Sequence, residues 1–408
     1  MSSKRTATIG GRLLCGVAIA ALLLCVEVPA RAQTWTVIHS FTQVDGAGPV
    51  AGLTMDAAGN FYGTTSGGGW RGRPTSHGTV FKLTHTETGW VLTTLHVFNG
   101  LDGDAPESRV IFGPDGALYG TTYDGGSDYG TVYRLEPPLG FCHSGSCPWT
   151  ATVLHAFQGG SDGAYPGSGD LAFDQQGNIY GTAVLGGNGV GCNGYCGLVF
   201  KLTRSGGSWS YSVLYSFRGG DDGENPDGGV VRDASGNLYG TTVHGGGADN
   251  GVIFELMPSG SGWAERVLYT FTNSSDGAGP NAGLIFDCCG NLYGTTPTDG
   301  EYNAGTVYEL SPSNGGWNFA VLASVPTLAG NGSEASLAMD GNGNLYGTAW
   351  SGLVFKLTPS GDNWVLTQLG NGDLGISCSL VVDSNGVVYG TDQFGGDYNL
   401  GSVFEIMQ

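Results

Sequence analysis

The sequence predicts an all-β fold, a seven-bladed β-propeller with four antiparallel strands per blade. The main observation is a short phrase, a tight turn followed by an aromatic residue and Gly-Thr, that occurs seven times. Successive copies lie 43 to 61 residues apart, the length of a unit that buries its apolar face by stacking against its neighbours. In addition, the two ends of the chain match different strands of one unit. The repeated tyrosines are Tyr62, Tyr119, Tyr180, Tyr239, Tyr293, Tyr346 and Tyr389.

Each unit contains four strand-like runs, which we name a, b, c and d from the axis outward. In the fifth unit they are residues 282–287, 291–296, 305–310 and 317–325. Val, Leu, Phe, Tyr and Thr dominate these runs, and Gly, Asn and Asp separate them, as expected for strands and turns. We find no convincing helical periodicity after residue 32. Four antiparallel strands repeated around a circle are typical of a propeller.

The repeated residues have a structural explanation. An Asp begins the turn between the a and b strands, where it can accept backbone N–H groups, and a Gly closes the turn. This turn is too short to supply the oxygen ligands of a calcium loop. In the phrase itself, Tyr suits a half-buried strand with its hydroxyl at a polar edge, and Gly lets a ring or backbone approach closely. Use in all seven units indicates packing, because one active site needs its chemistry once.

The chain ends predict how the ring closes. Residues 35–41 resemble the d strands, such as residues 92–98, whereas residues 401–406 resemble a c strand. The first strand therefore supplies the d strand that the last blade lacks, which leaves no open sheet edge. A tryptophan stands near the start of each d strand, and we expect these rings to pack between blades rather than to stack on sugars.

Residues 1–32 are predicted to be a secretory signal peptide, with a basic start, an apolar run from Leu13 to Val26 and a small-residue cleavage site at Ala30-Arg31-Ala32. Residues 33–408 would then be a single propeller domain, secreted or periplasmic in a bacterium, with no further membrane-length apolar stretch. The full chain has a formal charge of −20, and the leader holds four of its 15 basic residues. Such an acidic surface excludes nucleic acid as a partner. We expect a monomer.

Seven cysteines follow the leader, and export makes disulfides permissible. Cys142 with Cys147 and Cys192 with Cys196 form close pairs that we interpret as local loop disulfides, with zinc ligation as the alternative. The other three, Cys288, Cys289 and Cys378, leave the connectivity open because an odd number cannot all pair within one chain.

Residues 290–296, Gly-Asn-Leu-Tyr-Gly-Thr-Thr, followed by residues 305–310, Gly-Thr-Val-Tyr-Glu-Leu, resemble the tandem repeats of the GloVer family of exported bacterial proteins. The resemblance covers the chain after the leader. It implies an exported repeat protein and supplies no catalytic residues. A more distant similarity to NHL and streptogramin-lyase-like propellers supports the fold alone.

We expect function on the face that carries the d–a and b–c loops, because loops on a rigid scaffold are where binding usually resides. The d–a loops repeat an Asp-Gly turn, and its aspartates are candidate calcium ligands: Asp45, Asp102, Asp162, Asp222 and Asp276. Calcium is the one candidate cofactor, although Asp-Gly also makes ordinary turns. The b–c loops supply candidate ligand-binding residues: Arg71, Arg73, His77, Asp124, Asp128, His244, Asp249, Asp299 and Asp397.

The predicted function is non-catalytic binding or scaffolding of a carbohydrate or protein ligand through this face. The alternative is a propeller enzyme, a lyase or hydrolase acting on a polysaccharide or a cyclic ester, with His77 or His244 as general base. No nucleophile elbow, zinc-protease motif or phosphate loop is present in the sequence.

Overall fold

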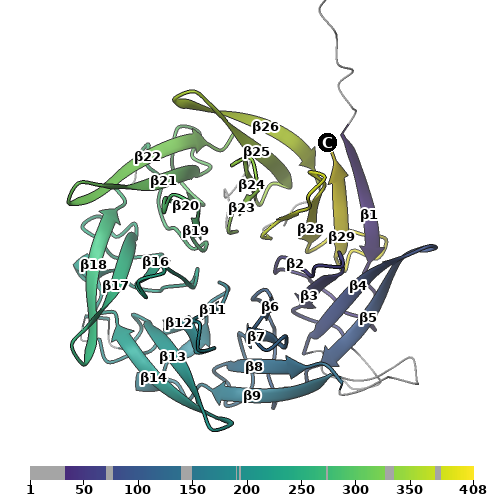
Figure 1. Cartoon of the computed structure of the whole chain (residues 1–408), viewed down its shortest axis with the longest axis horizontal. Coiled ribbons are helices and arrows are strands. Elements are labelled where there is room, and N and C mark those ends of the chain that lie inside the picture. The colour runs from purple at the N-terminus through teal and green to yellow at the C-terminus, as the bar shows by residue number, and fades with distance from the viewer. Residues whose placement is uncertain are drawn as a thin grey trace, which may run out of the picture. The chain divides into compact units, whose positions relative to one another are not determined.

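The computed structural model describes residues 33–69, 77–138, 149–189, 191–192, 194–272, 274–326, 335–372 and 378–408. Residues Gln33–Gln408 form one compact unit of seven antiparallel sheets around a central axis (Figure 1). Each sheet is one blade, and the predicted seven-bladed propeller is confirmed. Among the described residues, no helix is long and apolar enough to span a membrane.

The strands of each blade follow one another from the axis outward. The a strands are β2 (Thr54–Met55), β6 (Ile111–Phe112), β11 (Ala172–Phe173), β15 (Val230–Arg232), β19 (Ile285–Phe286), β23 (Ala338–Met339) and β27 (Val381–Val382). The b strands are β3 (Phe61–Thr65), β7 (Leu118–Thr122), β12 (Ile179–Leu185), β16 (Leu238–Thr242), β20 (Leu292–Thr296), β24 (Leu345–Thr348) and β28 (Val388–Asp392). The c strands are β4 (Thr79–Thr86), β8 (Thr131–Glu136), β13 (Leu198–Ser205), β17 (Val252–Ser259), β21 (Thr306–Ser313), β25 (Leu353–Ser360) and β29 (Ser402–Met407). The d strands are β1 (Thr34–Ser40), β5 (Gly89–Val97), β9 (Thr150–Ala156), β14 (Ser208–Ser216), β18 (Gly262–Thr270), β22 (Gly316–Ser324) and β26 (Asn363–Asn371).

The a strands are shorter than the sequence predicted. In the fifth unit the predicted run of residues 282–287 pairs as a strand only at Ile285–Phe286. The residues before it approach the axis, where backbones of neighbouring blades meet: a Cβ on Gly228 would lie 2.4 Å from Ala282 O. Three short elements lie in d–a loops, namely η1 (Gly160–Asp162), β10 (Ala164–Pro166) and η2 (Gly220–Asp222).

The ring closes as predicted, with the N-terminal strand in the last blade. β1 pairs antiparallel with β29, so that sheet has the order β1-β29-β28-β27. Trp35 of β1 stacks on Phe404 of β29, with the ring centroids 4.1 Å apart. The sheet therefore joins the first and last strands of the propeller, and Figure 1 shows them side by side.

The Tyr and Gly of the repeated phrase each have a defined contact. Tyr180 Oη donates to the turn residue Asp174 at 3.0 Å, and that carboxylate also accepts the Asn178 amide at 2.9 Å. A Cβ on Gly181 would lie 2.6 Å from the ring of Phe200 on the neighbouring c strand. The glycine is thus required by the close approach of that ring, and the Asp is the turn residue that the sequence predicted.

The two threonines make different connections. The first joins one blade to the next, because Thr64 Oγ1 donates to Ser108 O at 3.2 Å and Thr391 Oγ1 donates to Ala51 O at 2.8 Å. The second stays within its blade, as when Thr122 Oγ1 donates to Asp124 O at 2.9 Å in the b–c loop. These bonds explain why the phrase repeats with the blades.

The tryptophans of the d strands pack between blades, as predicted. Trp209 meets Tyr119 of the preceding blade edge-on at 6.3 Å between ring centroids, and Trp317 meets Tyr239 in the same way at 5.7 Å. Aromatic pairs of this geometry add packing free energy beyond their buried area. The apolar core is correspondingly divided into clusters that span blade boundaries.

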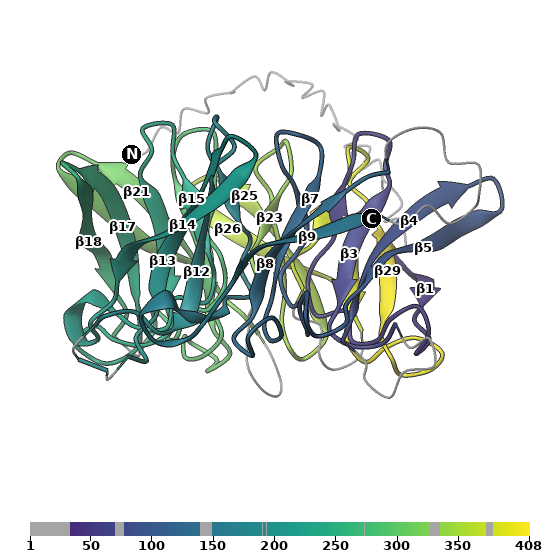
Figure 2. The same ribbon diagram turned by 90° about the horizontal axis from the view of Figure 1, so that it is seen from below.

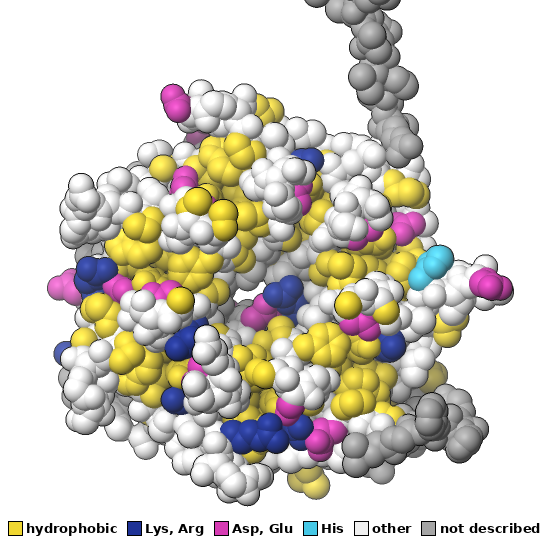
Figure 3. All heavy atoms as spheres, in the orientation of Figure 1, with side chains coloured by type: hydrophobic (Ala, Val, Ile, Leu, Met, Phe, Trp, Pro, Cys, Tyr) yellow, Lys and Arg dark blue, Asp and Glu magenta, His cyan; other side chains and the backbone are white. Residues whose placement is uncertain are grey.

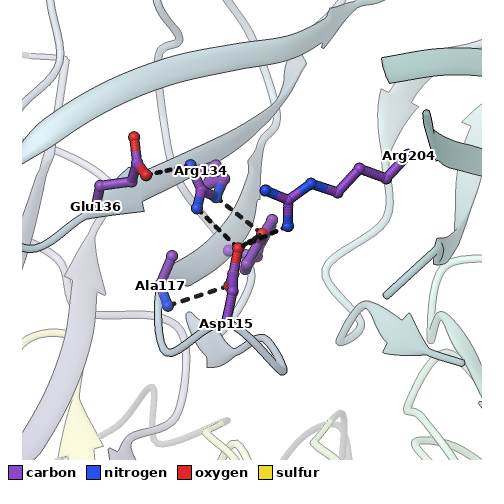
Figure 4. A network of polar contacts seen from close by, with 6 residues as sticks. Asp115, Ala117, Arg134, Glu136 and Arg204 are labelled. Atoms are coloured by element: carbon purple, nitrogen blue, oxygen red, sulfur yellow. Dashed lines mark hydrogen bonds and ion pairs between the residues drawn. The ribbon is translucent and has the colours of Figure 1, made fainter. Parts of the chain in front are cut away.

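One blade replaces the usual turn contacts with an ionic network (Figure 4). The blade of β6–β9 has Gly113 where other turns have Asp, and the Tyr119 ring occupies the space beside it. Asp115 replaces that Asp as the carboxylate of the turn. It accepts from the guanidinium of Arg134 in its own blade at 2.7 Å and from that of Arg204 in the next blade at 3.1 Å. The network therefore links two blades at the a–b end of the ring.

Candidate functional site

The d–a and b–c loops lie together at one end of the ring, which is the predicted loop face (Figure 2). Isolated β-bridges connect the two kinds of loop, for example Asp104 with Asp124 and Glu224 with His244. In each bridge the d–a loop of one blade contacts the b–c loop of the same blade. The loop face is therefore held by backbone pairing as well as by side chains.

The five predicted calcium ligands each fasten their own d–a turn. Asp102 contacts His96 Nε2 at 3.0 Å and accepts the Asn99 amide at 2.9 Å. Burial raises the pKa of Asp102, but these hydrogen bonds outweigh it and hold the pKa below its ordinary value. The d-strand partner is His or Tyr according to the blade: His39 for Asp45, His96 for Asp102, His155 for Asp162, Tyr215 for Asp222 and Tyr269 for Asp276.

These contacts explain why His and Tyr exchange at one d-strand position, since both reach the turn carboxylate. The five aspartates belong to five different blades and do not converge. Among the described residues, the one group of three possible metal-ligating side chains within 4.8 Å is Cys192, Cys196 and Glu224. The two sulfurs of that group are already in contact with each other as a pair, with Cα atoms 5.5 Å apart.

The predicted b–c loop residues are distributed around the ring. His77 Nδ1 lies 2.6 Å from Asp104 of the next blade, and Gly245 N donates to Asp249 at 2.8 Å. Asp397 N donates to Ser40 Oγ at 3.2 Å, and Asp128 and Asp299 occupy positive-φ turn positions. The exposed His244 bridges Glu224 through its backbone. Arg71 and Arg73, like Cys142 and Cys147, fall outside the described residues.

Exposed aromatic side chains gather on the same loops. Among the described residues, six aromatic side chains have more than a third of their surface exposed, and all six lie in b–c loops: Tyr123, Tyr129, Tyr195, Tyr302, Phe394 and Tyr398. Tyr123 stacks on Tyr165 of the next blade's d–a loop, with centroids 4.8 Å apart, and Tyr129 meets the same ring edge-on at 6.1 Å. Tyr123, Tyr129 and Tyr165 therefore form one contiguous aromatic patch, and exposed patches are typical of binding surfaces.

Tyr165 adopts the left-handed backbone conformation that recurs before the repeated Pro of the d–a loops. Its φ is +55°, and the equivalent residues are Gly48 and Gly279, with φ of +64° each, Ala105, with +51°, and Asn225, with +59°. A positive φ costs a residue with a side chain roughly 1 kcal/mol or more. The conformation belongs to the turn of these loops, and at this position the Tyr165 ring lies against Tyr123.

Polar side chains also converge at the ring axis, which we call the axial cavity. All seven blades contribute lining residues, and the polar side chains among them are Glu107, Arg109, Ser168, Asp170, Asn281, Ser336 and Ser379. The cavity volume is about 50 Å³, and the cavity is partly open to solvent. Figure 3 looks along this axis and shows basic and acidic side chains together beside the central opening.

Two carboxylates of this region have raised pKa values. Burial, followed by the negative charges of Asp227 and Asp124, raises the pKa of Glu107 to about 7. Burial also raises the pKa of Asp227, against hydrogen bonds from the amide and hydroxyl of Ser168. Arg109 is neutralised by Asp170, which it contacts through Nε at 3.1 Å and through Nη2. A group that titrates near neutral pH can bind a ligand or exchange a proton.

One of the predicted residues, Asp124, is near this cluster. Its negative charge contributes to the raised pKa of Glu107 and of Tyr123. The sequence did not reveal Glu107, Arg109, Asp170 or Asp227. Each follows the repeated Pro of its d–a loop, at positions that other blades fill with unrelated residues such as Val50. Comparing those variable positions between blades is the signal that could have found them.

The repeat family model described as Gloeobacter/Verrucomicrobia repeat matches residues 25–193 and 188–404. No curated protein matches the chain. A solved structure described as an oxidoreductase (glucose dehydrogenase) from Thermus thermophilus is 16% identical, with 92% of this chain and 100% of that chain covered and a TM-score of 0.43. Another, described as a gluconolactonase, is 11% identical, with 92% of each chain covered and a TM-score of 0.44. Neither likeness bears on function at this level.

Proposed function

The chain belongs to the Gloeobacter/Verrucomicrobia repeat family, and from this premise we propose that it is an exported, non-catalytic propeller that binds a carbohydrate through its loop face. The observation that carries the proposal is the concentration of exposed aromatic side chains in the b–c loops. Aromatic faces supply large, rigid contact area with a polar tip, which suits a sugar ring. The polar side chains that line the axial cavity supply further hydrogen-bonding groups for hydroxyls.

Export accords with the predicted leader and with the Cys192–Cys196 pair, which we infer forms a disulfide outside the cytoplasm. The pair lies in the b–c loop of the β11–β14 blade, where the buried Cys196 joins an apolar cluster with Phe217. The disulfide would therefore stabilise the loop face that binds the ligand. A protein is the alternative ligand to a carbohydrate, so a binding screen must include both.

Tyr165→Gly tests the proposal without adding backbone strain, because glycine already occupies two equivalent positions, Gly48 and Gly279. We expect the variant to fold as stably as the wild type or better, and to bind its glycan roughly fivefold more weakly, as loss of about 1 kcal/mol of ring contact implies. A glycan and protein-ligand array identifies the ligand, and titration calorimetry then measures the affinity.

Val365→Ala serves as the matched control, since Val365 is an exposed apolar residue on the outside of the ring in β26. It should leave the affinity unchanged. Unaltered binding by Tyr165→Gly, or an array with no glycan bound, would contradict the proposal.

The alternative function is catalysis at the same opening, a hydrolase or lyase acting on a polysaccharide or cyclic ester. Glu107 favours it, because a carboxyl group with a pKa of about 7 suits a general acid or base near neutral pH. Mass spectrometry of each bound glycan after incubation distinguishes the two functions. Products formed by the wild type and absent with Glu107→Gln would establish an enzyme.

Calcium binding by the d–a aspartates stays a prediction. If Asp102 and its equivalents bind calcium in addition to fastening their turns, a chelator should lower the melting temperature and added calcium should restore it. A thermal melt that neither reagent changes would remove calcium from the proposal.

A further inference from the structure

Successive blades meet through paired positions on their d strands. Where β9 meets β14, the ring of Tyr211 lies flat on His155, with the centroids 3.8 Å apart and the planes 1° from parallel. Where β18 meets β22, Phe319 lies on Tyr269 in the same way, at 3.7 Å and 6°. In both junctions the covered side chain is the His or Tyr that fastens a d–a turn. A ring of one blade therefore covers that side chain of the blade before it.

The junction between these two, where β14 meets β18, lacks the covering ring. Tyr211 and Phe319 each stand two residues after the tryptophan of their d strand, and in β18 that position holds Glu265. The side chain that a ring there would cover is Tyr215, which fastens its own d–a turn as the others do. Among the described residues, the one ring in contact with Tyr215 is Phe217, which meets it edge-on. A flat group can therefore stack on Tyr215 where the flanking junctions already hold a ring.

A cleft, which we call the junction cleft, lies at this place. Its volume is about 450 Å³, within the roughly 300 to 1,000 Å³ of small-molecule sites, and it is open to solvent. No described residue donates a hydrogen bond to the Glu265 carboxyl group, whose Oε1 is buried. An unpaired acceptor of this kind costs free energy that a donor on a ligand would recover. The aromatic and charged residues that line the junction cleft are Tyr215, Trp263, Arg218, Asp221, Asp222 and Glu265.

This lining favours a neutral ligand that carries hydroxyl groups. The Arg218 guanidinium is exposed, with its Cζ 6.0 Å from the centre of the Tyr215 ring, and supplies donors. The carboxylates of Asp221 and Glu265 supply acceptors. A cation would be repelled by the guanidinium and an anion by the carboxylates, whereas a hydroxyl can donate to one and accept from the other. An aromatic face beside such groups suits a sugar ring.

We propose that the junction cleft is a second carbohydrate site, in which a neutral pyranose with equatorial hydroxyls takes the place that Tyr211 and Phe319 occupy at the flanking junctions. The apolar face of such a sugar stacks on Tyr215, while the hydroxyls at its rim donate to Glu265 and accept from Arg218. An axial hydroxyl projects from the face of the ring and would hold it away from Tyr215. The proposal rests on the proposed carbohydrate function and adds a site between the outermost strands β14 and β18 (Figure 1).

Glu265→Phe tests the proposal, because it supplies the ring that Phe319 provides at the next junction. The probe is the β-1,4-linked glucose tetramer, titrated by calorimetry at pH 8, where Glu265 is ionised because burial and the charge of Asp222 raise its pKa only to about 7. We expect the variant to melt at the wild-type temperature or above, and to bind the tetramer roughly tenfold more weakly. The β-1,4-linked mannose tetramer, with an axial hydroxyl on each ring, should bind the wild type about tenfold more weakly than the glucose tetramer.

Tyr215→Ala removes the stacking surface and keeps Glu265, and the blade of β19–β22 already has Ala323 at this position. It should weaken binding of the glucose tetramer to the same extent. Val321→Phe is the matched control, since it adds the same ring to an exposed position of β22. It should leave the affinity unchanged.

The outcomes separate this site from the proposed function. Tyr165→Gly, which alters the aromatic patch of the loop face, should leave binding in the junction cleft unchanged. The site is overturned if Glu265→Phe or Tyr215→Ala binds the glucose tetramer like the wild type, if the mannose tetramer binds equally well, or if Val321→Phe loses affinity to the same extent. Carbohydrate binding at the patch stands in each of those cases when Tyr165→Gly weakens binding of the glycan that the array identifies. An array with no glycan bound, together with no binding of the glucose tetramer, overturns both.

Discussion

At the scale of the residue, Glu107 links stability to pH. Its folded pKa of about 7 lies above the ordinary value of 4.5, so between these values the folded chain holds a proton that the unfolded chain has released. Stability contributed by this group is therefore fully present below about pH 4.5 and is lost as the pH rises through 7. The same reasoning applies to Glu265, whose pKa is raised to about 7 by burial and by Asp222.

Glu107→Gln should accordingly stabilise the protein at pH 8, by roughly 1 to 3 kcal/mol in the free energy of unfolding, and leave it unchanged at about pH 4. Chemical denaturation at the two pH values measures the difference. Glu265→Gln should also raise the free energy of unfolding at pH 8. Because Glu265 does not line the axial cavity, this variant shows the effect of a raised pKa apart from the position at the axis. A Glu107→Gln protein that is less stable at the higher pH would show that the carboxylate is held by contacts that the charge argument omits.

At the scale of the element, β1 is the strand on which ring closure depends. Deleting residues Thr34–Phe41 removes the partner of β29 and exposes Phe404, which Trp35 otherwise covers. We expect aggregation or a large loss of thermal stability, because an uncovered edge strand pairs with other chains. Size-exclusion chromatography and a thermal melt give the readout. Trp35→Phe, which keeps the strand and part of the stacking, should remain unaggregated; an unaltered deletion variant would refute closure by β1.

At the scale of the whole molecule, the sequence predicted the ring well and the site poorly, for a physical reason. Tyr180 and Gly181 make contacts that every blade needs, so repetition reveals them. Glu107 and Asp227 lie in different blades. The ring brings them close enough for the negative charge of Asp227 to raise the pKa of Glu107. No single unit contains that relation, so periodicity cannot show it. Loop aspartates such as Asp102 were conspicuous because they repeat, and the structure gives them a role in every turn.

The pairing of β1 with β29 also sets the order in which the molecule can be completed. The bond from Asp397 N to Ser40 Oγ spans 357 residues of chain, which is close to the greatest separation the propeller contains. During synthesis, β1 has no partner until β29 has been made. Contacts between residues so far apart in the sequence form slowly. We expect the pairing of β1 with β29, which closes the ring, to break slowly as well. The propeller should thus owe its persistence to a high barrier to unfolding, with a lifetime set by the rate at which β1 separates from β29.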